Sequence, residues 1–255
     1  MRPKQYIRRV KDSDTAILFI HGILGTPEHF EPFIPLVPPD WTIYNILLKG
    51  HGGTVKDFSA ASMTEWEQQV HRTLQELLAS HSRVVVCAHS MGTLFAIREA
   101  AENPIAEMFL LNVPLKVRIK PRLIKTSSRV FLGNVKPDDK WSTAAQKAYG
   151  IERDMHIIRY LGWIPRYLEL FSEIRKTRKL VDRLSVPCRV YLSRKDEMVS
   201  LRSGNWFNDN PAVKVKRLDQ SGHFYYSPKD LKRLRNDFRK MIRRISDAGE
   251  NRRNL

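Results

Sequence analysis

Short apolar runs alternate along this chain with longer segments in which apolar residues recur at helical spacing. The short runs cover residues 16–20, 41–48, 83–88, 108–111, 189–192 and 213–218. Runs this short and this apolar are typical of strands buried on both faces, as in a parallel sheet. The pattern therefore predicts a sheet whose strands are separated by helices.

The spacing predicts helices between these runs. Residues 64–80 repeat apolar side chains every three or four positions, with Thr64 as the expected N-cap. A second helix is expected over 93–102, and a last one opens at Pro228 after Ser227. Strands that alternate with helices indicate the α/β class, with a doubly wound and mostly parallel sheet.

One segment, residues 114–183, breaks this alternation. It holds no clear buried strand, and its helix-like stretches are interrupted by Pro121, Pro137 and Pro165. It also carries 17 lysines and arginines against 7 acidic residues, a net charge of +10. We interpret it as a small helical cap inserted into a core formed by residues 1–113 and 184–255.

The composition of the chain is strongly basic. The 255 residues carry a formal net charge of +17, and 42% are hydrophobic, enough for a packed core. Such a charge attracts anionic substrates, nucleic acid or membrane surfaces weakly. Because the basic residues are scattered, an ordinary solvated surface is the favoured interpretation, and no specific nucleic-acid partner is expected. The oligomeric state is left open.

The setting is expected to be cytoplasmic. Cys87 and Cys188 lie far apart, each in or beside an apolar run, which is typical of free thiols in a reducing compartment. The apolar run after the basic N-terminus is too short for a secretory signal, and no stretch is long enough for a transmembrane helix.

The sharpest local signal is the sequence around Ser90. A buried strand enters Ala-His-Ser-Met-Gly at residues 88–92 and a helix leaves it. A serine nucleophile at such a turn requires small residues two positions before and two after it. Gly92 meets this requirement, and Ala88 stands where glycine is usual.

A serine nucleophile needs a base, and the base needs an orienting acid. His223 follows the run at 213–218 and is the candidate base, while Asp196 follows the run at 189–192 and is the candidate acid. Glu197 is a fallback for the acid, and Asp219 is a weaker alternative. Each residue alone has an ordinary structural explanation, but the order serine, acid, histidine is the one that this scaffold requires.

Two backbone N–H groups are expected to stabilise a developing oxyanion. One belongs to Met91, directly after the serine, and the other to Ile23 in the loop after the first run, with Leu24 as second choice. His21 is expected to brace this loop. His51, in a glycine-rich turn, is expected to be structural rather than catalytic.

Together, the segments at 21–25, 50–52, 88–92, 195–199 and 221–223 resemble the α/β-hydrolases of the bacterial carboxylesterase and monoacylglycerol lipase group. The resemblance implies hydrolysis of short- to medium-chain carboxylic esters through a serine acyl-enzyme, with no cofactor or metal. It implies Ser90, Asp196 and His223 as a catalytic triad, with Ile23 and Met91 as oxyanion donors. The alanine at position 88 and the high positive charge depart from that group.

The sequence therefore predicts a serine ester hydrolase that acts on a small-molecule ester. Thioester or amide hydrolysis and acyl transfer remain open, because the same residues support them. A non-catalytic binding module is the alternative from another class, since a fold does not fix a function. The charge of the cap also suggests selection of anionic substrates.

Overall fold

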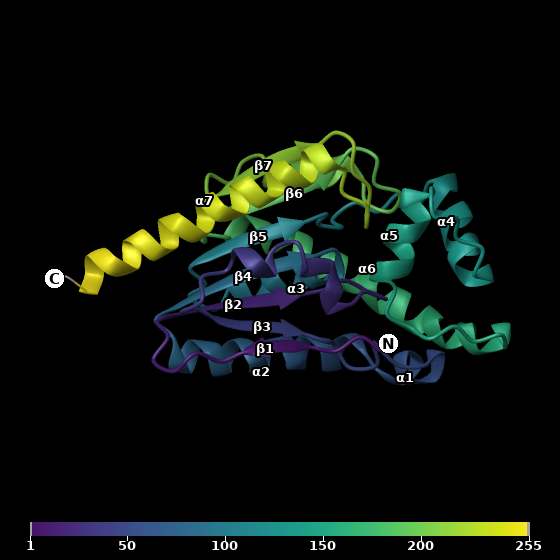
Figure 1. Cartoon of the computed structure of the whole chain (residues 1–255), viewed down its shortest axis with the longest axis horizontal. Helices are drawn as coiled ribbons and strands as arrows, with labels where there is room; N and C mark the ends of the chain where they lie inside the picture. The colour runs from purple at the N-terminus through teal and green to yellow at the C-terminus, as the bar shows by residue number, and fades with distance from the viewer. Residues whose placement is uncertain (1, 254–255) are drawn as a thin grey trace.

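The computed structural model describes residues 2–253, with side chains described to residue 248. Its centre is a seven-stranded sheet in the order β1-β3-β2-β4-β5-β6-β7, which confirms the predicted mostly parallel sheet (Figure 1). The strands are β1 (Tyr6–Arg8), β2 (Thr15–Ile20), β3 (Thr42–Ile46), β4 (Arg83–His89), β5 (Glu107–Leu111), β6 (Cys188–Ser193) and β7 (Val213–Leu218). Only β1 was not predicted, a three-residue edge strand that pairs antiparallel with β3.

The parallel strands end together at one edge of the sheet. Ile20 of β2 pairs with Ala88 of β4, His89 pairs with Leu111 of β5, and Ser193 of β6 pairs with Leu218 of β7. The loops that follow these strands therefore open onto the same edge. In open α/β sheets, ligands bind at this carboxyl edge.

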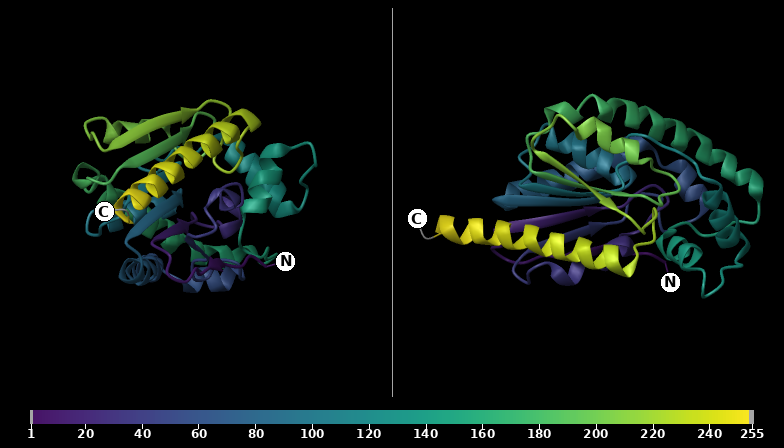
Figure 2. Two further views of the ribbon diagram at one scale, coloured as in Figure 1. Left: turned by 60° about the vertical axis from the view of Figure 1, so that its left-hand side comes forward. Right: turned by 90° about the horizontal axis from the view of Figure 1, so that it is seen from above.

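Helices cover both faces of the sheet (Figure 2). The apolar residues of α2 (Met63–Ser80), α3 (Met91–Ala100) and α6 (Ile164–Arg178) share one core with Ala16, Leu18 and Ile20 of β2. Residues of α7 (Pro228–Arg253) share the other core with Ile17 and Phe19. The alternation along β2 separates the two cores, as expected for a strand buried on both faces.

The predicted N-cap of α2 was wrong. The helix begins at Met63, and the side chain of Ser62 accepts a hydrogen bond from Glu65 N at 3.2 Å. Thr64 lies inside the first turn. Ser62 and Thr64 are each followed three positions later by a glutamate, Glu65 and Glu67, so the capping-box pattern does not separate the two candidates. Ahead of α2, the short helix α1 (Val55–Ala60) has a complete capping box on Thr54.

Between β5 and β6, the chain forms α4 (Pro121–Leu132), α5 (Lys140–Ala148), η3 (Ile157–Trp163), α6 and η4 (Val181–Arg183). We call residues 114–183 the inserted segment. Figure 1 shows α4 and α5 at the end of the molecule opposite the C-terminus. Backbone hydrogen bonds tie the segment to the carboxyl edge, from Gly150 N to Leu24 O at 2.8 Å and from Gly52 N to Gly150 O at 2.5 Å.

The helices of the inserted segment differ in how they pack against the sheet. Its last helix, α6, runs back over the sheet, where Leu170 and Ile174 join the core shared with α2 and α3. The helices α4 and α5 instead lie outside that layer. No helix within residues 2–253 combines the length and the apolar character that a membrane span requires.

Candidate active site

Ser90 occupies a strained turn between β4 and α3. Its φ of 50° and ψ of −123° lie in a region that side-chain-bearing residues rarely adopt. A Cβ on Gly92 would collide with the carbonyl oxygen of Ile20, so the turn requires glycine there. Ala88, by contrast, is fully buried in β4. The departure from glycine at position 88 is therefore compatible with the turn.

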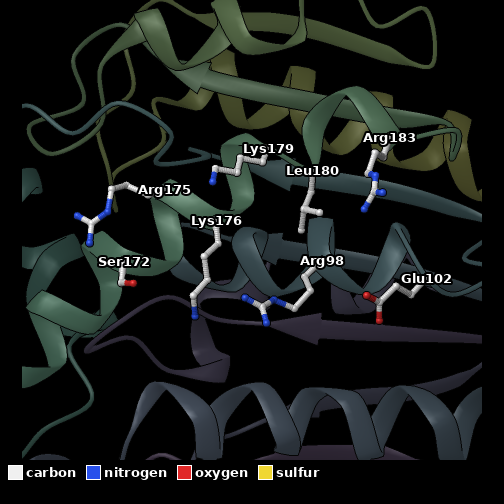
Figure 3. Close-up of a pocket in the computed structure, with 8 residues that line it drawn as sticks. All are labelled: Arg98, Glu102, Ser172, Arg175, Lys176, Lys179, Leu180 and Arg183. Carbon is white, nitrogen blue, oxygen red and sulfur yellow. The ribbon is translucent and has the colours of Figure 1, made fainter.

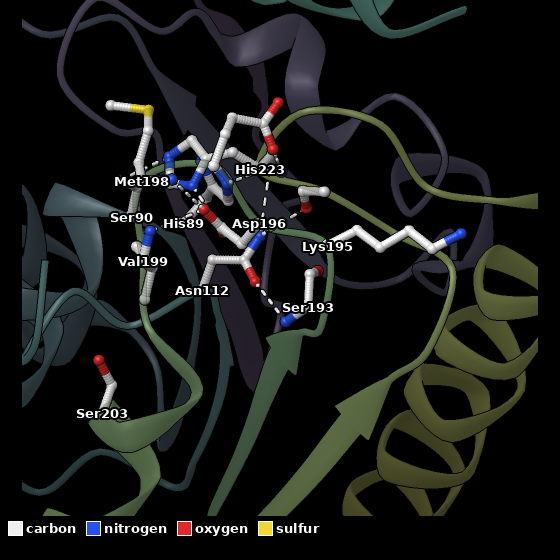
Figure 4. Close-up of polar contacts among 12 residues, drawn as sticks. His89, Ser90, Asn112, Ser193, Lys195, Asp196, Met198, Val199, Ser203 and His223 are labelled. Atoms are coloured by element: carbon white, nitrogen blue, oxygen red, sulfur yellow. Dashed lines mark hydrogen bonds and ion pairs between the residues drawn. The ribbon is translucent and has the colours of Figure 1, made fainter. Parts of the chain in front are cut away.

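The structure brings Ser90, His223 and Asp196 together, as Figure 4 shows. Nε2 of His223 lies 3.0 Å from Oγ of Ser90, and Nδ1 of His223 lies 2.8 Å from Oδ2 of Asp196. All three side chains are buried, with Ser90 6% exposed and His223 1% exposed. Each distance is within the range expected between a nucleophile, its base and an orienting acid.

Backbone donors fix the carboxylate of Asp196. Its Oδ1 accepts hydrogen bonds from Met198 N and Val199 N, both at 2.7 Å. The other oxygen, Oδ2, is thereby directed at His223. Asp219, the weaker alternative, lies elsewhere and forms an exposed ion pair with Arg194 at 3.3 Å.

The electrostatics of His223 favour its protonated form. Burial alone lowers the pKa of His223, but the charge of Asp196 and the hydrogen bond to it outweigh burial, and Glu197 adds to them. The net result is a pKa above the ordinary value of 6.5. A raised pKa makes the imidazole a stronger base toward Ser90.

Asn112 and His89 hold the loop that carries His223. Nδ2 of Asn112 donates to the carbonyl oxygen of His223 at 3.2 Å, and Nε2 of His89 donates to the same oxygen at 3.0 Å. Oδ1 of Asn112 accepts from Ser193 N at 3.0 Å. These positioning roles were not predicted, although His89 directly precedes Ser90 and Asn112 directly follows β5.

His89 also lies in a stack of buried rings. Its ring centroid is 3.8 Å from that of His29 and 4.8 Å from that of His223. Burial, assisted by the charges of the neighbouring histidines, lowers the pKa of His29 to about 3 and that of His89 well below its usual range. His29 and His89 are therefore neutral near pH 7, and do not compete with His223 for a proton.

A second carboxylate, that of Glu197, lies beside the acid. Its Oε2 accepts a hydrogen bond from His223 N at 3.2 Å, and Arg122 Nη2 lies 3.7 Å from the same oxygen. Burial and, next, the charge of Asp196 raise the pKa of Glu197. Glu197 thus contacts the backbone of His223, whereas Asp196 contacts its ring.

The loop after β2 lies directly against Ser90. A Cβ on Gly22 would lie 2.8 Å from Cβ of Ser90, so only glycine allows this approach. Leu24 N, the second-choice oxyanion donor, is occupied by Nε2 of His51 at 3.2 Å. Ile23 N has no hydrogen-bond acceptor within residues 2–253. Met91 N opens the first turn of α3, where helix N–H groups lack an intrahelical acceptor.

His21 and His51 support this loop. Nε2 of His21 accepts from Leu48 N at 3.0 Å, and its Nδ1 lies 2.8 Å from the carbonyl oxygen of Gly22. Burial lowers the pKa of His21 to about 4 and that of His51 well below its usual range. Both rings therefore act as neutral hydrogen-bonding groups inside the fold.

A cationic groove of about 780 Å³ lies apart from these residues, between α3 and the second half of α6 (Figure 3). Its lining comprises Arg98, Glu102, Ser172, Arg175, Lys176, Lys179, Leu180 and Arg183. Part of the charge is neutralised, because Arg98 and Lys176 both pair with the buried carboxylate of Glu173. Among the residues described, no cluster of three or more histidine, cysteine or acidic side chains is arranged to hold a metal ion.

A mostly parallel sheet with one antiparallel edge strand, and with a serine on a strained strand-to-helix turn, defines the α/β-hydrolase fold. The chain belongs to the alpha/beta hydrolase family, whose model matches residues 17–233. This confirms the family resemblance recognised in the sequence. No curated protein sequence matches the chain.

Solved structures with the same fold include several lipolytic enzymes. One, from work on the metagenome-derived lipolytic enzymes LipS and LipT, has a TM-score of 0.69 at 19% identity, covering 94% of this chain and 98% of that one. The monoacylglycerol lipase of Paleococcus ferrophilus has a TM-score of 0.65 at 14% identity, with coverages of 95% and 99%. A thioesterase domain from the curacin biosynthetic pathway has a TM-score of 0.57 at 15% identity, with coverages of 92% and 98%.

Proposed function

We propose that the protein is a serine hydrolase of carboxylic esters, with Ser90, His223 and Asp196 as its catalytic triad. The observation that carries this proposal is the continuous chain of contacts from Ser90 Oγ through the imidazole of His223 to Asp196 Oδ2. The strained backbone at Ser90 supports it, because unfavourable geometry at a buried polar residue is typical of a functional site.

In this mechanism, Ser90 Oγ attacks the ester carbonyl carbon while His223 Nε2 accepts the hydroxyl proton. The carbonyl oxygen becomes an oxyanion, and the N–H groups of Ile23 and Met91 stabilise it. Asp196 holds the imidazole and stabilises its cation. Collapse of the intermediate breaks the ester bond, and His223 donates its proton to the departing alcohol.

The second half of the cycle repeats the first with water. His223 takes a proton from water, whose oxygen attacks the acyl carbon, and a second oxyanion forms at the same N–H groups. Its collapse releases the carboxylic acid and returns the proton to Ser90. Ser90 is almost fully buried, and Trp141 of α5 in the inserted segment packs against Gly222, which directly precedes His223.

The substrate class we favour is short- to medium-chain esters or monoacylglycerols, in keeping with the lipolytic enzymes among the structural neighbours. A thioesterase among those neighbours makes thioesters the second candidate. Amide hydrolysis and acyl transfer follow from the same residues. The buried, free thiols of Cys87 and Cys188 support a cytoplasmic setting.

The test is the turnover of p-nitrophenyl acetate and butyrate by the wild type and by Ser90→Ala. The substitution is expected to lower kcat by about four orders of magnitude or more. Ser127→Ala, at an exposed serine of α4, is the matched control and retains activity. A fluorophosphonate probe is expected to label the wild type but not Ser90→Ala. Wild-type turnover in Ser90→Ala contradicts the proposal, and the absence of turnover and labelling in the wild type favours a binding module.

A further inference from the structure

Exposed apolar side chains are concentrated in the inserted segment. Among the residues described, the exposed large hydrophobic side chains are Tyr6, Ile119, Ile124, Leu132, Met155, Ile157, Ile158, Leu161, Ile164, Leu168 and Phe171. All except Tyr6 lie within residues 119–171. Scattered exposed apolar residues are ordinary, but such a concentration marks a surface that contacts another apolar phase or molecule.

The helices of the segment present these residues as stripes. On α6, Ile164, Leu168 and Phe171 recur at three- and four-residue spacing and therefore share one face. On α4, Ile124 and Leu132 are two turns apart and also share a face. Ile157 and Ile158, on η3, are the most exposed of the set, at 72% and 75%. These faces are the reverse of the usual arrangement, in which the apolar stripe packs on the core.

The three elements adjoin one another. The ring of Phe131 on α4 lies 5.7 Å from that of Tyr160 on η3, with the guanidinium of Arg153 5.7 Å above Phe131. The element η3 continues directly into α6 at Ile164. The exposed residues at 119–171 therefore belong to one projecting region of the molecule, which we call the apolar end (Figure 1).

Unpaired positive charge adjoins the exposed apolar residues of the apolar end. Lys125 on α4 and Arg175 on α6 are exposed and have no carboxylate partner within the described part of the chain. Arg175 lies one turn beyond Phe171 on the same face of α6, where the basic wall of the groove begins (Figure 3). The inserted segment as a whole has a net charge of +10.

We propose that the apolar end docks on the surface of an anionic lipid bilayer. Apolar side chains rimmed by lysine and arginine match such a surface, because the side chains enter the acyl boundary while the cations meet negative headgroups. A second copy of the chain is a poorer occupant, since two segments of the same strong positive charge repel each other. The docking does not depend on ester hydrolysis.

The position of the apolar end connects docking with the candidate active site. The inserted segment is hydrogen-bonded to the loop after β2 through Gly150 and Leu24, and it pairs with the acid loop through a β-bridge between Val117 and Val199. A bilayer that holds the apolar end therefore lies on the side of the molecule where the loops around Ser90 open. Amphiphilic molecules leaving the bilayer would have a short path to that edge.

Cosedimentation with large unilamellar vesicles tests the proposal, with Ser90→Ala protein so that no lipid is hydrolysed. Binding is expected to vesicles of phosphatidylcholine mixed with phosphatidylglycerol, to be weak on phosphatidylcholine alone, and to fall as salt rises. Ile157→Ser combined with Ile158→Ser is expected to weaken binding about tenfold or more. Tyr6→Ser is the matched control, because Tyr6 is the one exposed large apolar residue outside the segment among those whose exposure is described.

A second pair of variants tests the charge. Lys125→Glu with Arg175→Glu is expected to weaken binding roughly tenfold or more, whereas Lys232→Glu with Lys240→Glu, the same charge change on exposed residues of α7, has a smaller effect. Circular dichroism verifies that each variant is folded. Absence of binding, equal binding to both vesicle types, or equal losses in test and control variants overturns the proposal. If the apolar end instead binds an acidic protein, no binding to vesicles is expected. Turnover of a soluble ester by protein with Ser90 intact tests the proposed function separately.

Discussion

The guanidinium of Arg122 lies 4.0 Å over the ring of Trp141 and thereby joins α4 to α5. The same guanidinium donates a hydrogen bond to the carbonyl oxygen of Lys195 and lies 3.7 Å from Oε2 of Glu197. Because Lys195 and Glu197 flank Asp196 in the chain, a single side chain connects the inserted segment with the loop that holds the candidate acid.

Loss of this connection is expected to lower activity without unfolding the protein. Arg122→Gln removes the charge and the stacking contact, and we expect kcat/KM to fall roughly tenfold as the acid loop moves. Arg118→Gln is the matched control, because Arg118 precedes α4 with an exposed side chain. If the two variants have the same kcat/KM, the connection has no role in catalysis.

Asp196→Asn is expected to lower kcat by about three to four orders of magnitude while preserving the fold. The amide oxygen retains the hydrogen bonds from Met198 N and Val199 N, which directs the amide nitrogen at His223. A donor at that position favours the imidazole tautomer that cannot accept a proton from Ser90. Steady-state kinetics and thermal unfolding measure the two effects.

Glu197→Gln tests which of the two neighbouring carboxylates, Asp196 or Glu197, acts as the acid that orients His223. Its effect on kcat is expected to be small, since a glutamine oxygen can still accept the hydrogen bond from His223 N. A large loss of kcat in Glu197→Gln, with none in Asp196→Asn, would assign the acid to Glu197 instead.

The pH dependence of kcat/KM measures the effect of the Glu197 charge on the pKa of His223. His223 must be neutral to act as a base, so kcat/KM is expected to rise as pH increases through a pKa above 6.5. The charge of Glu197 contributes to that raised pKa. Removing it by Glu197→Gln is therefore expected to shift the rising limb to lower pH. A limb that does not move, or that moves to higher pH, contradicts this electrostatic role.

The turn at Ser90 requires glycine at position 92, whereas position 88 accepts alanine. Gly92→Ala places a Cβ against the carbonyl oxygen of Ile20 and is expected to lower the melting temperature strongly and abolish activity. Ala88→Gly is expected to cost about 1 kcal/mol of stability, because glycine is unfavourable within a strand, and to leave kcat unchanged. A large change in kcat in Ala88→Gly would show that the alanine tunes the turn.

Sequence patterns predicted Ser90, Asp196 and His223 because each lies within the first few residues after a run that forms a parallel strand. Parallel strands place their carboxyl ends at one edge of the sheet, so the three loops that follow them open onto the same edge. Asn112 also follows such a run, but its role depends on which carbonyl groups face it. That arrangement comes from tertiary packing and leaves no local pattern.

Sequence patterns did not predict the edge strand β1 or the connection through Arg122, because neither produces a distinctive local pattern. β1 has only three residues, one of them Arg8, and so lacks a long apolar run. The contacts of Arg122 with Trp141 and Glu197 span distant parts of the chain. In the inserted segment, α4 and α6 also carry exposed apolar stripes, so helical spacing predicts the helices but not which faces are buried.

The backbone of His223 is held on both sides of its Cα, because its carbonyl oxygen accepts hydrogen bonds from His89 and Asn112 and its N–H donates to Glu197. These contacts fix the point from which the side chain starts, so any adjustment of the imidazole is limited to its side-chain torsions. A general base must take a proton at one position and deliver it at another. In the proposed mechanism, the fixed backbone therefore returns the ring to the same place after each proton transfer.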